Sequence, residues 1–416
     1  MSKPITLAII GAGSRGGQTY GKYCLEHPED VRVVAVADPR EYNRNKTAEQ
    51  HDIPPENVFS DWKELLSRPK LADAVIISTI ETMHKEPAIK AAELGYHILL
   101  EKPMAPDVDS CKAIVEAAKK YKVILMVCHV LRYAKYFAKI KEIIDSGKIG
   151  DIANIQHLEG VGWWHQAHSF VRGNFRNVKD SSFMLLAKSC HDIDLINWWI
   201  GRKCLRVSSF GELKHFRKEN KPSEAADRCM DCVLSDDKCP YSAKKFYFDR
   251  LHKGEHHWPL AMLVTEFTEE ALEKALREGP YGRCVYNCDN DVVDHQVVAL
   301  EYEERISATF TMSAFTPHGR FTRIMGTKGY IDGSEGKLRI LDFNSGQWEE
   351  IEMETGGGHS GGDAGLMNAF IQTIKTGDEK YSLTGPDVTL ESHLIVFAAE
   401  QARLDKRVVE MKEYFY

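Results

Sequence analysis

The sequence predicts an α/β domain with a doubly wound parallel sheet, followed by an α+β domain with a large, open and mostly antiparallel sheet. Short apolar strands alternate with helical segments in the first 130 residues, as in doubly wound folds. After residue 133 the strands alternate apolar with polar residues, which is typical of an antiparallel sheet with one face on helices. At 416 residues the chain is also too long for one ordinary domain.

The amino-terminal domain is predicted over residues 1–130. Helices such as 87–94 and 108–121 separate its strands, so the strands should run parallel with right-handed crossovers. Each strand is a continuous apolar run, as expected of strands covered on both faces, and they are predicted at 5–10, 31–37, 74–78, 97–100 and 123–127.

The second domain is predicted over residues 131–416. Two late helices within 364–406 should lie near the domain interface. Residues from about 214 to 282 are interpreted as a Cys-rich insertion, because charge is dense there and the hydrophobic content is low. The remaining elements are helices at 134–146 and 189–200 and strands at 152–161, 206–213, 297–303, 306–315, 323–325, 338–341 and 348–351.

Composition excludes several classes of function. Lys plus Arg number 54 against 61 Asp plus Glu, so no basic excess is available to bind a nucleic acid. No apolar run approaches the length that crosses a bilayer, so a membrane partner is not expected. Ten cysteines without a recognisable export signal indicate free thiols in the reducing cytoplasm.

A glycine-rich turn, Gly11-Ala12-Gly13-Ser14-Arg15-Gly16, lies between the first strand and a helical segment. Glycines at these positions permit a tight turn, a close approach of backbone to a pyrophosphate, and close helix–strand packing. Asp38 ends the second strand, where its carboxylate can accept hydrogen bonds from ribose hydroxyls. This pattern favours NAD over NADP, although Arg40 nearby could accommodate the 2′-phosphate of NADP.

A Glu101-Lys102-Pro103 turn ends the fourth strand and places Lys102 at the carboxyl edge of the parallel sheet. A Lys beside a cationic nicotinamide ring should have a lowered pKa. It could then exchange a proton with a substrate hydroxyl while hydride moves to the cofactor. The alternative is a solvated surface Lys, the usual fate of this residue.

These motifs resemble the Gfo/Idh/MocA oxidoreductases, a family that includes glucose–fructose oxidoreductase and inositol dehydrogenase. The likeness continues through Arg132, the segment 143–150, and His191 followed by Asp194. It implies a Rossmann domain, bound NAD(P), and a sugar or cyclitol substrate, with Lys102 as the catalytic Lys and His191 beside the reacting hydroxyl. The cofactor-binding residues would be Gly11, Gly13, Ser14, Arg15, Gly16, Asp38, Thr79, His84, Glu101 and Lys102.

The second domain supplies candidate substrate-binding residues. Lys188, His191 and Asp194 recur every third residue, which places them on one face of a helix, and Asp194 could orient the imidazole of His191. Many family members carry an Asp where this chain has Ala187, with Lys188 next to it, which suggests a substrate with a carboxylate or several acceptor oxygens. Tryptophan can stack on a sugar ring, and His359 lies in a glycine-rich segment, 356–363. The full set is Arg132, Trp164, His165, Arg172, Lys188, His191 and His359.

Cysteines cluster in and just after the insertion. Cys229, Cys232, Cys239 and Cys284, or Cys288 in place of Cys284, could give the four thiolates of a structural zinc or an iron–sulfur cluster. A metal would explain how an insertion with few hydrophobic residues keeps its shape. The alternative is a set of plain free thiols.

The leading functional hypothesis is an NAD(P)-dependent dehydrogenase acting on a CH–OH group of a sugar, sugar acid or cyclitol. A redox-neutral alternative keeps NAD bound and uses transient oxidation to cleave a glycosidic bond, as some relatives do. A third possibility is a non-catalytic protein that senses NAD or a sugar. A homo-oligomer is expected, because an open sheet leaves an exposed face and edges.

Overall fold

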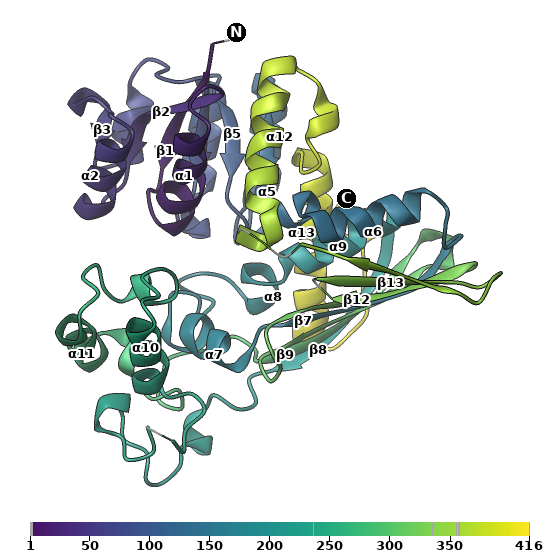
Figure 1. Ribbon diagram of the computed structural model, residues 1–416. Coiled ribbons are helices and arrows are strands. Elements are labelled where there is room, and N and C mark those ends of the chain that lie inside the picture. The colour runs from purple at the N-terminus through teal and green to yellow at the C-terminus, as the bar shows by residue number, and fades with distance from the viewer. Residues whose placement is uncertain (1–2, 236, 335, 355, 357, 416) are drawn as a thin grey trace.

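The computed structural model describes residues 3–235, 237–334, 336–354, 356 and 358–415, and two sheets organise this part of the chain (Figure 1). The first is a six-stranded parallel sheet in the order β3-β2-β1-β4-β5-β6, which confirms the predicted doubly wound domain. Its strands are β1 (Ile5–Ile10), β2 (Val31–Ala37), β3 (Val58–Phe59), β4 (Ala74–Ile77), β5 (His97–Leu100) and β6 (Leu125–Val127). Strand β3 was not predicted, because two residues leave no readable pattern.

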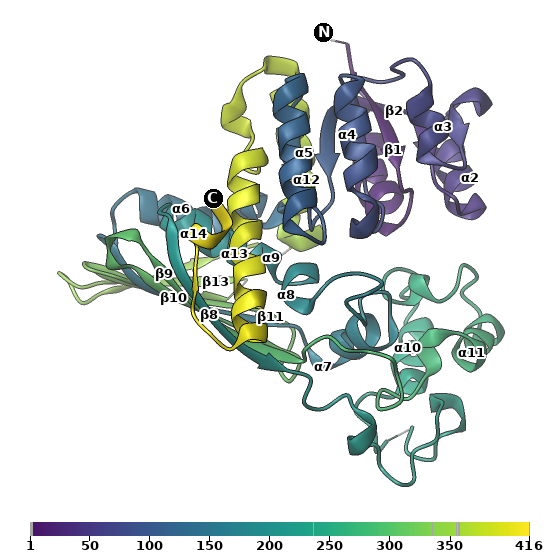
Figure 2. The ribbon, with the colours of Figure 1, turned by 180° about the vertical axis from the view of Figure 1, so that it is seen from behind.

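Helices cover both faces of this sheet, so its strands are almost wholly buried; Leu7 to Ile10, for example, are at most 1% exposed. Figure 2 shows α3, α4 and α5 on one face, and Figure 1 shows α1 and α12 (Gly362–Thr376) on the other. The helices between the strands are α1 (Lys22–Glu26), α2 (Glu41–Gln50), α3 (Trp62–Ser67), α4 (Lys85–Glu93) and α5 (Val108–Tyr121).

The second sheet has nine strands in the order β14-β13-β12-β11-β7-β10-β9-β8-β15. Only β7 and β10 pair in parallel among these neighbours, so the predicted mostly antiparallel sheet is confirmed. Its strands are β7 (Ile152–Gly160), β8 (Cys204–Glu212), β9 (His295–Tyr302), β10 (Ser307–Ser313), β11 (Gly319–Gly326), β12 (Gly329–Ser334), β13 (Lys337–Asp342), β14 (Trp348–Glu352) and β15 (Val409–Glu410).

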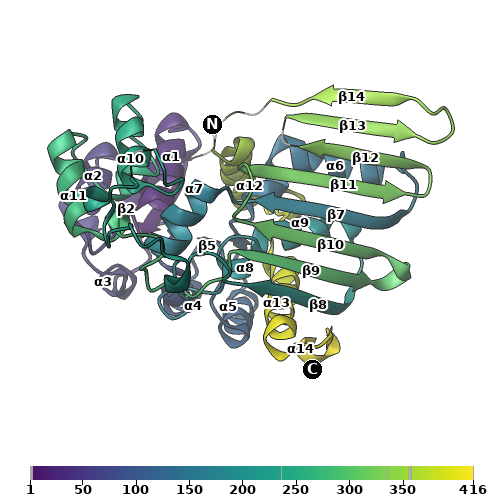
Figure 3. The same cartoon turned by 90° about the horizontal axis from the view of Figure 1, so that it is seen from below.

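One face of the second sheet packs on helices and the other is bare. Helices α6 (Lys135–Asp145), α9 (Cys190–Ile200) and α13 (Pro386–Asp405) lie behind the sheet in Figure 3, together with the short α8 (Met184–Ala187) and α14 (Lys412–Phe415). None of the described helices lies over the face turned to the viewer. Apolar side chains on the strands stay open to solvent, among them Phe210, which is 72% exposed.

The insertion occupies the connection between β8 and β9 and therefore extends to residue 294, beyond the predicted 282. It contains helices α10 (Ala243–His252) and α11 (Glu269–Glu278), which lie close to α7 (Trp163–His165) in Figures 1 and 2. A separate apolar cluster forms within it, from Tyr247, Leu260, Leu272 and Leu276 among others. The expectation that the insertion lacks hydrophobic residues to hold its shape is therefore wrong.

Helix α12 (Gly362–Thr376) and helix α13 join the two sheets. The backbone N–H of Met104, beyond β5, donates a hydrogen bond of 2.9 Å to Nε2 of His393 on α13. The N–H of Val127 on β6 donates to the carbonyl oxygen of Thr384, at 3.0 Å. No helix in the described part of the chain is both long and apolar enough to cross a membrane.

Candidate active site

The glycine-rich turn needs glycine for steric reasons. Gly11 has φ +90°, and a Cβ atom there would lie 2.6 Å from the carbonyl oxygen of Ser78. A Cβ atom on Gly16 would lie 2.1 Å from the carbonyl oxygen of Gly11. The turn leads into a π-helical segment, η1 (Ser14–Gly21). The backbone is thus held in the close turn that dinucleotide binding requires.

A cavity of about 430 Å³ lies at the carboxyl edge of the parallel sheet. Gly11, Pro39 and Thr79 line it, with Thr82 and Met83. This position, beside the glycine-rich turn, is where doubly wound folds bind nucleotides. The residues present therefore fit a bound dinucleotide.

Asp38 lies at this site but its carboxylate already has donors. Oδ2 accepts hydrogen bonds from the N–H of Ala12 (2.7 Å) and from Nη2 of Arg40 (2.9 Å). Oδ1 accepts from the backbone N–H of Arg40 (2.8 Å) and from its Nε (3.0 Å). Arg40 therefore neutralises the Asp38 carboxylate, which weakens the expected preference for NAD over NADP.

Arg15 forms two ion pairs, one with Glu101 of its own domain and one with Asp363 of the second domain. Nε of Arg15 lies 2.6 Å from Oε1 of Glu101, and its Nη2 lies 2.7 Å from Oδ1 of Asp363, on α12. The hydroxyl of Tyr20 also donates to Oε1 of Glu101. Burial opposes the charge of Glu101, but Arg15 and Tyr20 outweigh it and lower its pKa. The Arg15–Asp363 pair thus joins the glycine-rich turn to the second domain, and Glu101 holds Arg15 from its own side.

His84 supports the turn that carries Lys102. It is 1% exposed, its Nδ1 lies 3.0 Å from the carbonyl oxygen of Pro103, and its Nε2 lies 3.2 Å from that of Thr79. Both ring nitrogens therefore contact backbone, so the side chain holds the Glu101-Lys102-Pro103 turn against the segment that follows β4.

Lys102 and His191 approach each other from the two domains. Nζ of Lys102 donates a hydrogen bond of 2.7 Å to the carbonyl oxygen of Ala187, at the end of α8. His191 lies on α9, is 4% exposed, and its Nδ1 finds no hydrogen-bond partner among the described residues. Burial first, and then the charge of Lys102, hold the pKa of His191 well below its usual value. The imidazole is therefore neutral at neutral pH.

His129 lies beside His191, and sequence reasoning missed it. We refer to Lys102, His129 and His191 as the cluster. The ring centroid of His129 lies 5.4 Å from that of His191 and 5.3 Å from that of His393. Burial lowers its pKa to about 4, against the attraction of Asp194, whose Oδ2 lies 3.7 Å from Nδ1. A signal was available, because His129 follows β6 at the same sheet edge as Lys102.

Asp194 does not orient His191, contrary to expectation. Its carboxylate binds Arg132 through two hydrogen bonds, of 2.7 and 2.8 Å, and both side chains are buried. Arg132 also donates to the carbonyl oxygen of Leu383. The guanidinium that was predicted to bind substrate is thus occupied in tying η4 (Val130–Tyr133) to α9 and the segment before α13.

Lys188 has a neutralising partner. Helix α8 ends at Ala187 and α9 begins at Cys190, so Lys188 and His191 do not share one continuous helix. Nζ of Lys188 lies 2.9 Å from Oε1 of Glu159, which is completely buried on β7, and Nε of Arg320 lies 2.9 Å from its Oε2. Lys188 therefore no longer indicates an acidic substrate, because Glu159 balances the positive charge of its amine.

His165 and His359 lie at the edges of the cluster. Burial, and then Lys188, hold the pKa of His165 well below its usual value, and Lys102 contributes in the same direction. Nδ1 of His165 has no hydrogen-bond partner among the described residues, and its ring stacks on Trp164 at 5.4 Å. The ring of His359 lies 6.0 Å from that of His191, and its Nδ1 lies 3.1 Å from both carboxylate oxygens of Asp363. In the segment 356–363, Gly357 lies outside the described residues.

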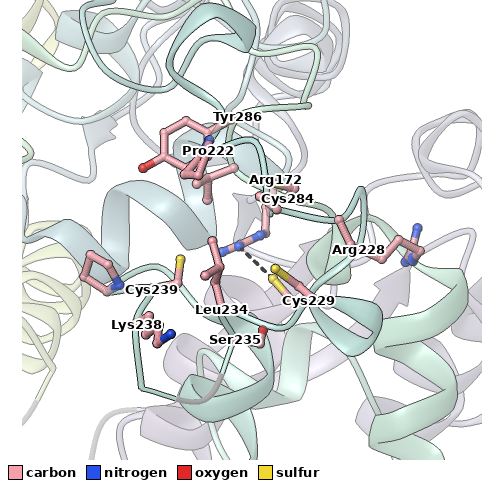
Figure 4. Close-up of a pocket in the computed structure, with 15 residues that line it drawn as sticks. Arg172, Pro222, Arg228, Cys229, Leu234, Ser235, Lys238, Cys239, Cys284 and Tyr286 are labelled. Carbon is pink, nitrogen blue, oxygen red and sulfur yellow. Dashed lines mark hydrogen bonds between the residues drawn. The ribbon is translucent and has the colours of Figure 1, made fainter.

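Arg172 lies among the cysteines of the insertion, not with Lys102 (Figure 4). It donates to the carbonyl oxygens of Arg283 (2.7 Å) and Tyr241 (2.8 Å), and its Nη2 lies 3.5 Å from Sγ of Cys229. These partners satisfy the guanidinium of Arg172, which is only 3% exposed. Arg172 therefore does not lie with the other residues that were predicted to bind substrate.

The cysteine cluster surrounds a cavity of about 70 Å³, lined by Arg172 and by Cys229, Cys232, Cys239 and Cys284. All ten cysteines are free thiols. In the described ranges no three His, Cys, Asp or Glu side chains are arranged to hold a metal ion. The predicted thiols thus gather in one place, but their arrangement does not fit a metal centre.

Models of two domains of one family match the chain. The model described as an oxidoreductase family, NAD-binding Rossmann fold, matches residues 5–129, and that of the C-terminal α/β domain matches residues 141–411. The chain belongs to the Gfo/Idh/MocA oxidoreductase family. This Gfo/Idh/MocA protein therefore carries an NAD-binding Rossmann domain, and the resemblance inferred from its motifs is confirmed.

Relatives of this Gfo/Idh/MocA protein have diverse names. It is 25% identical to the putative oxidoreductase YteT of Bacillus subtilis over 98% of both chains. It is 32% identical to the 2,7-anhydro-N-acetylneuraminate hydratase of Mediterraneibacter gnavus over 65% of this chain and 67% of that one. The fold matches that of scyllo-inositol dehydrogenase from Lactobacillus casei with bound NAD(H) and scyllo-inositol, at a TM-score of 0.68 and 17% identity, over 99% and 100% of the two chains.

Proposed function

We propose that the protein is an NAD(P)-dependent dehydrogenase that transfers a hydride between nicotinamide and a hydroxyl-bearing carbon of a sugar, sugar acid or cyclitol. One observation carries the proposal: the Lys102 amine, at the carboxyl edge of the parallel sheet, interacts with a buried, neutral imidazole from the second domain, that of His191. The scyllo-inositol dehydrogenase of the same fold, which has NAD(H) and scyllo-inositol bound, supports it.

The bound dinucleotide would supply the hydride acceptor. Gly11, Gly16 and Thr79 would hold it in the cavity beside the glycine-rich turn. Lys102 would take the proton of the substrate hydroxyl, since its amine is held at the sheet edge by the carbonyl oxygen of Ala187. His191 would bind the same oxygen through its unpartnered Nδ1.

Three further side chains would bind the remaining hydroxyls of the substrate. His165 offers an unpartnered Nδ1, and the ring centroid of His359 lies 6.0 Å from that of His191. Lys188 keeps 14% of its side chain exposed although Glu159 balances its charge. A neutral polyol suits this mixture of donors and acceptors better than an anion.

A second candidate is a redox-neutral reaction in which a sugar is oxidised transiently, loses or gains a group at the neighbouring carbon, and is reduced again. Two observations favour it. One relative is named a hydratase, and the unpartnered Nδ1 of His165 would give the site a second group, besides Lys102, that can accept or pass on a proton. Such an enzyme forms no net NADH.

The test is a panel of sugars, sugar acids and inositols, followed by NADH absorbance and by NMR of the products, with NADP⁺ in parallel because Arg40 neutralises Asp38. NADH formed in proportion to product supports the dehydrogenase. Product without net NADH supports the redox-neutral reaction. Failure of every panel member to react or to bind would contradict both.

We also propose a location in the cytoplasm and a homo-oligomeric state. The free thiols favour a reducing cytoplasm. The bare face of the nine-stranded sheet, with exposed Phe210 and Val297, favours a homo-oligomer. Size-exclusion chromatography with light scattering tests the second of these.

A further inference from the structure

The insertion adds an aromatic surface to the edge of the catalytic cluster. The ring centroid of Trp258, from the insertion, lies 5.0 Å from that of His165 and 5.7 Å from that of Trp164. Phe246, on α10, stacks on Trp164 at 5.4 Å. Helix α10 and helix α7 therefore present their aromatic side chains to each other, and we refer to Trp164, His165, Phe246 and Trp258 as the aromatic platform.

The platform is not a hydrophobic core. Trp258 is 36% exposed, and Trp164 is half-buried. Neither tryptophan belongs to any of the three apolar clusters found among the described residues, whereas Phe246 packs against the cluster of the insertion. Phe246 thus anchors the platform, and the two indoles stay open at its surface.

The platform is continuous with the proposed reaction centre. His165, a member of the platform, lies on α7, which follows directly after β7, and Oε1 of Glu159 on β7 lies 2.9 Å from Nζ of Lys188. Trp258 lies next to His165, and Trp164 lies next to both. A ligand whose reacting carbon is at Lys102 and which extends past His165 therefore meets an indole face next.

A cation is fixed at the outer end of the platform. The guanidinium of Arg250 lies 3.7 Å from the ring centroid of Phe246 and 5.2 Å from that of Trp164. Its Nε lies 3.5 Å from Glu255, which offsets its charge. Aromatic faces bordered by such donors are suited to a polar ring with an apolar face.

We propose that the aromatic platform is a second sugar subsite, so that the substrate is a disaccharide or other glycoside and not a free monosaccharide. Its first ring would react at Lys102 and His191, and its second ring would stack on the exposed indole of Trp258, beside Trp164. The proposal rests on the proposed function, which supplies the first subsite. It also gives the insertion a role, since Trp258 and Phe246 are both supplied by it.

The experiment compares paired probes on the NAD-loaded protein: D-glucose with cellobiose and maltose, and D-galactose with lactose and melibiose. Binding is measured by calorimetry and turnover by NADH absorbance and product NMR. The wild type is compared with Trp258→Ala, with Trp258→Phe, which keeps an aromatic face, and with Trp348→Ala, which removes an exposed indole on β14 far along the sheet.

At least one disaccharide is expected to bind about tenfold more tightly than its monosaccharide. Trp258→Ala should abolish that preference, Trp258→Phe should keep most of it, and Trp348→Ala should leave it intact. Monosaccharides that react and bind as well as every disaccharide, or a preference that survives Trp258→Ala, would overturn the second subsite alone. If no sugar of either size binds, the proposed function fails together with it.

Discussion

The side-chain amine of Lys102 and the backbone carbonyl oxygen of Ala187 lie 2.7 Å apart, so the edge of the parallel sheet contacts the end of helix α8 directly. This contact fixes the amine next to His191 without using a carboxylate. A backbone carbonyl carries no net charge, so it holds the amine in place and leaves it able to exchange a proton with a substrate.

Lys102→Ala is expected to lower kcat by about 10²- to 10⁴-fold, because the proton of the substrate hydroxyl then has no acceptor. The Kd for NAD should change little, since Gly11 and Thr79 still line the cofactor cavity. Steady-state kinetics and calorimetry with NAD check the two quantities separately. Lys90→Ala, which removes an exposed amine on α4, serves as the control. Turnover at a near-normal rate in Lys102→Ala would mean that another group accepts the proton.

The sheets and the residues at their edges could be predicted, because apolar runs and turns are local patterns. Gly11, Asp38 and Lys102 each follow a strand, so their place at the carboxyl edge is a consequence of the parallel order. The partners of Arg132 and Arg172 could not be predicted. A guanidinium in a sequence does not show whether it will meet a ligand, a carboxylate such as Asp194 or a backbone carbonyl.

Contacts between residues far apart in the sequence could not be predicted either. Glu159 lies on β7 and pairs with Lys188 and Arg320, and neither partner is near it in the chain. Trp258 comes from the insertion and reaches His165 only because α10 folds against α7. Such pairings depend on the tertiary arrangement, which local patterns of charge and hydrophobicity do not encode.

The buried pair of Glu159 and Lys188 predicts a non-additive effect on stability. Glu159→Gln should reduce the free energy of unfolding by roughly 3–5 kcal/mol, because Lys188 then loses its neutralising carboxylate and Arg320 keeps only its pair with Asp192. Adding Lys188→Met should recover part of the loss by removing one of the two cations. Urea denaturation of the two single variants and the double variant measures the coupling. Strictly additive losses would show that Glu159 and Lys188 do not stabilise each other.

His393 predicts a dependence of stability on pH. Its Nδ1 donates to the carbonyl oxygen of Thr389 while its Nε2 accepts the N–H of Met104, so the folded protein needs the neutral ring. Burial, and then the nearby His129, lower its pKa to about 3. Between the usual histidine pKa and this value only the unfolded chain takes up the proton. The free energy of unfolding should therefore fall as the pH decreases below about 6.5.

The variant His393→Gln should weaken this dependence by about one proton, or about 1.4 kcal/mol per pH unit. Denaturant melts at pH values from 7 to 4 measure the slope. His27→Gln, at an exposed imidazole, is the control and should leave the slope unchanged. An identical slope in His393→Gln and the wild type would mean that other buried groups, such as His129, account for the whole effect.

The insertion is expected to keep its fold when metal ions are removed. Its apolar cluster includes Leu272 and Leu276, which are completely buried. Burial raises the pKa of Cys239 and Cys284, so these thiols are protonated at neutral pH and are poor metal ligands in that form. Treatment with EDTA should leave the melting temperature unchanged, whereas Leu272→Ala should reduce the free energy of unfolding by about 2–5 kcal/mol. The metal content of the purified protein should be measured alongside these melts. A stoichiometric amount of zinc or iron, with a lower melting temperature after chelation, would contradict the prediction. It would show that the thiols hold a metal and that the apolar cluster alone does not maintain the insertion.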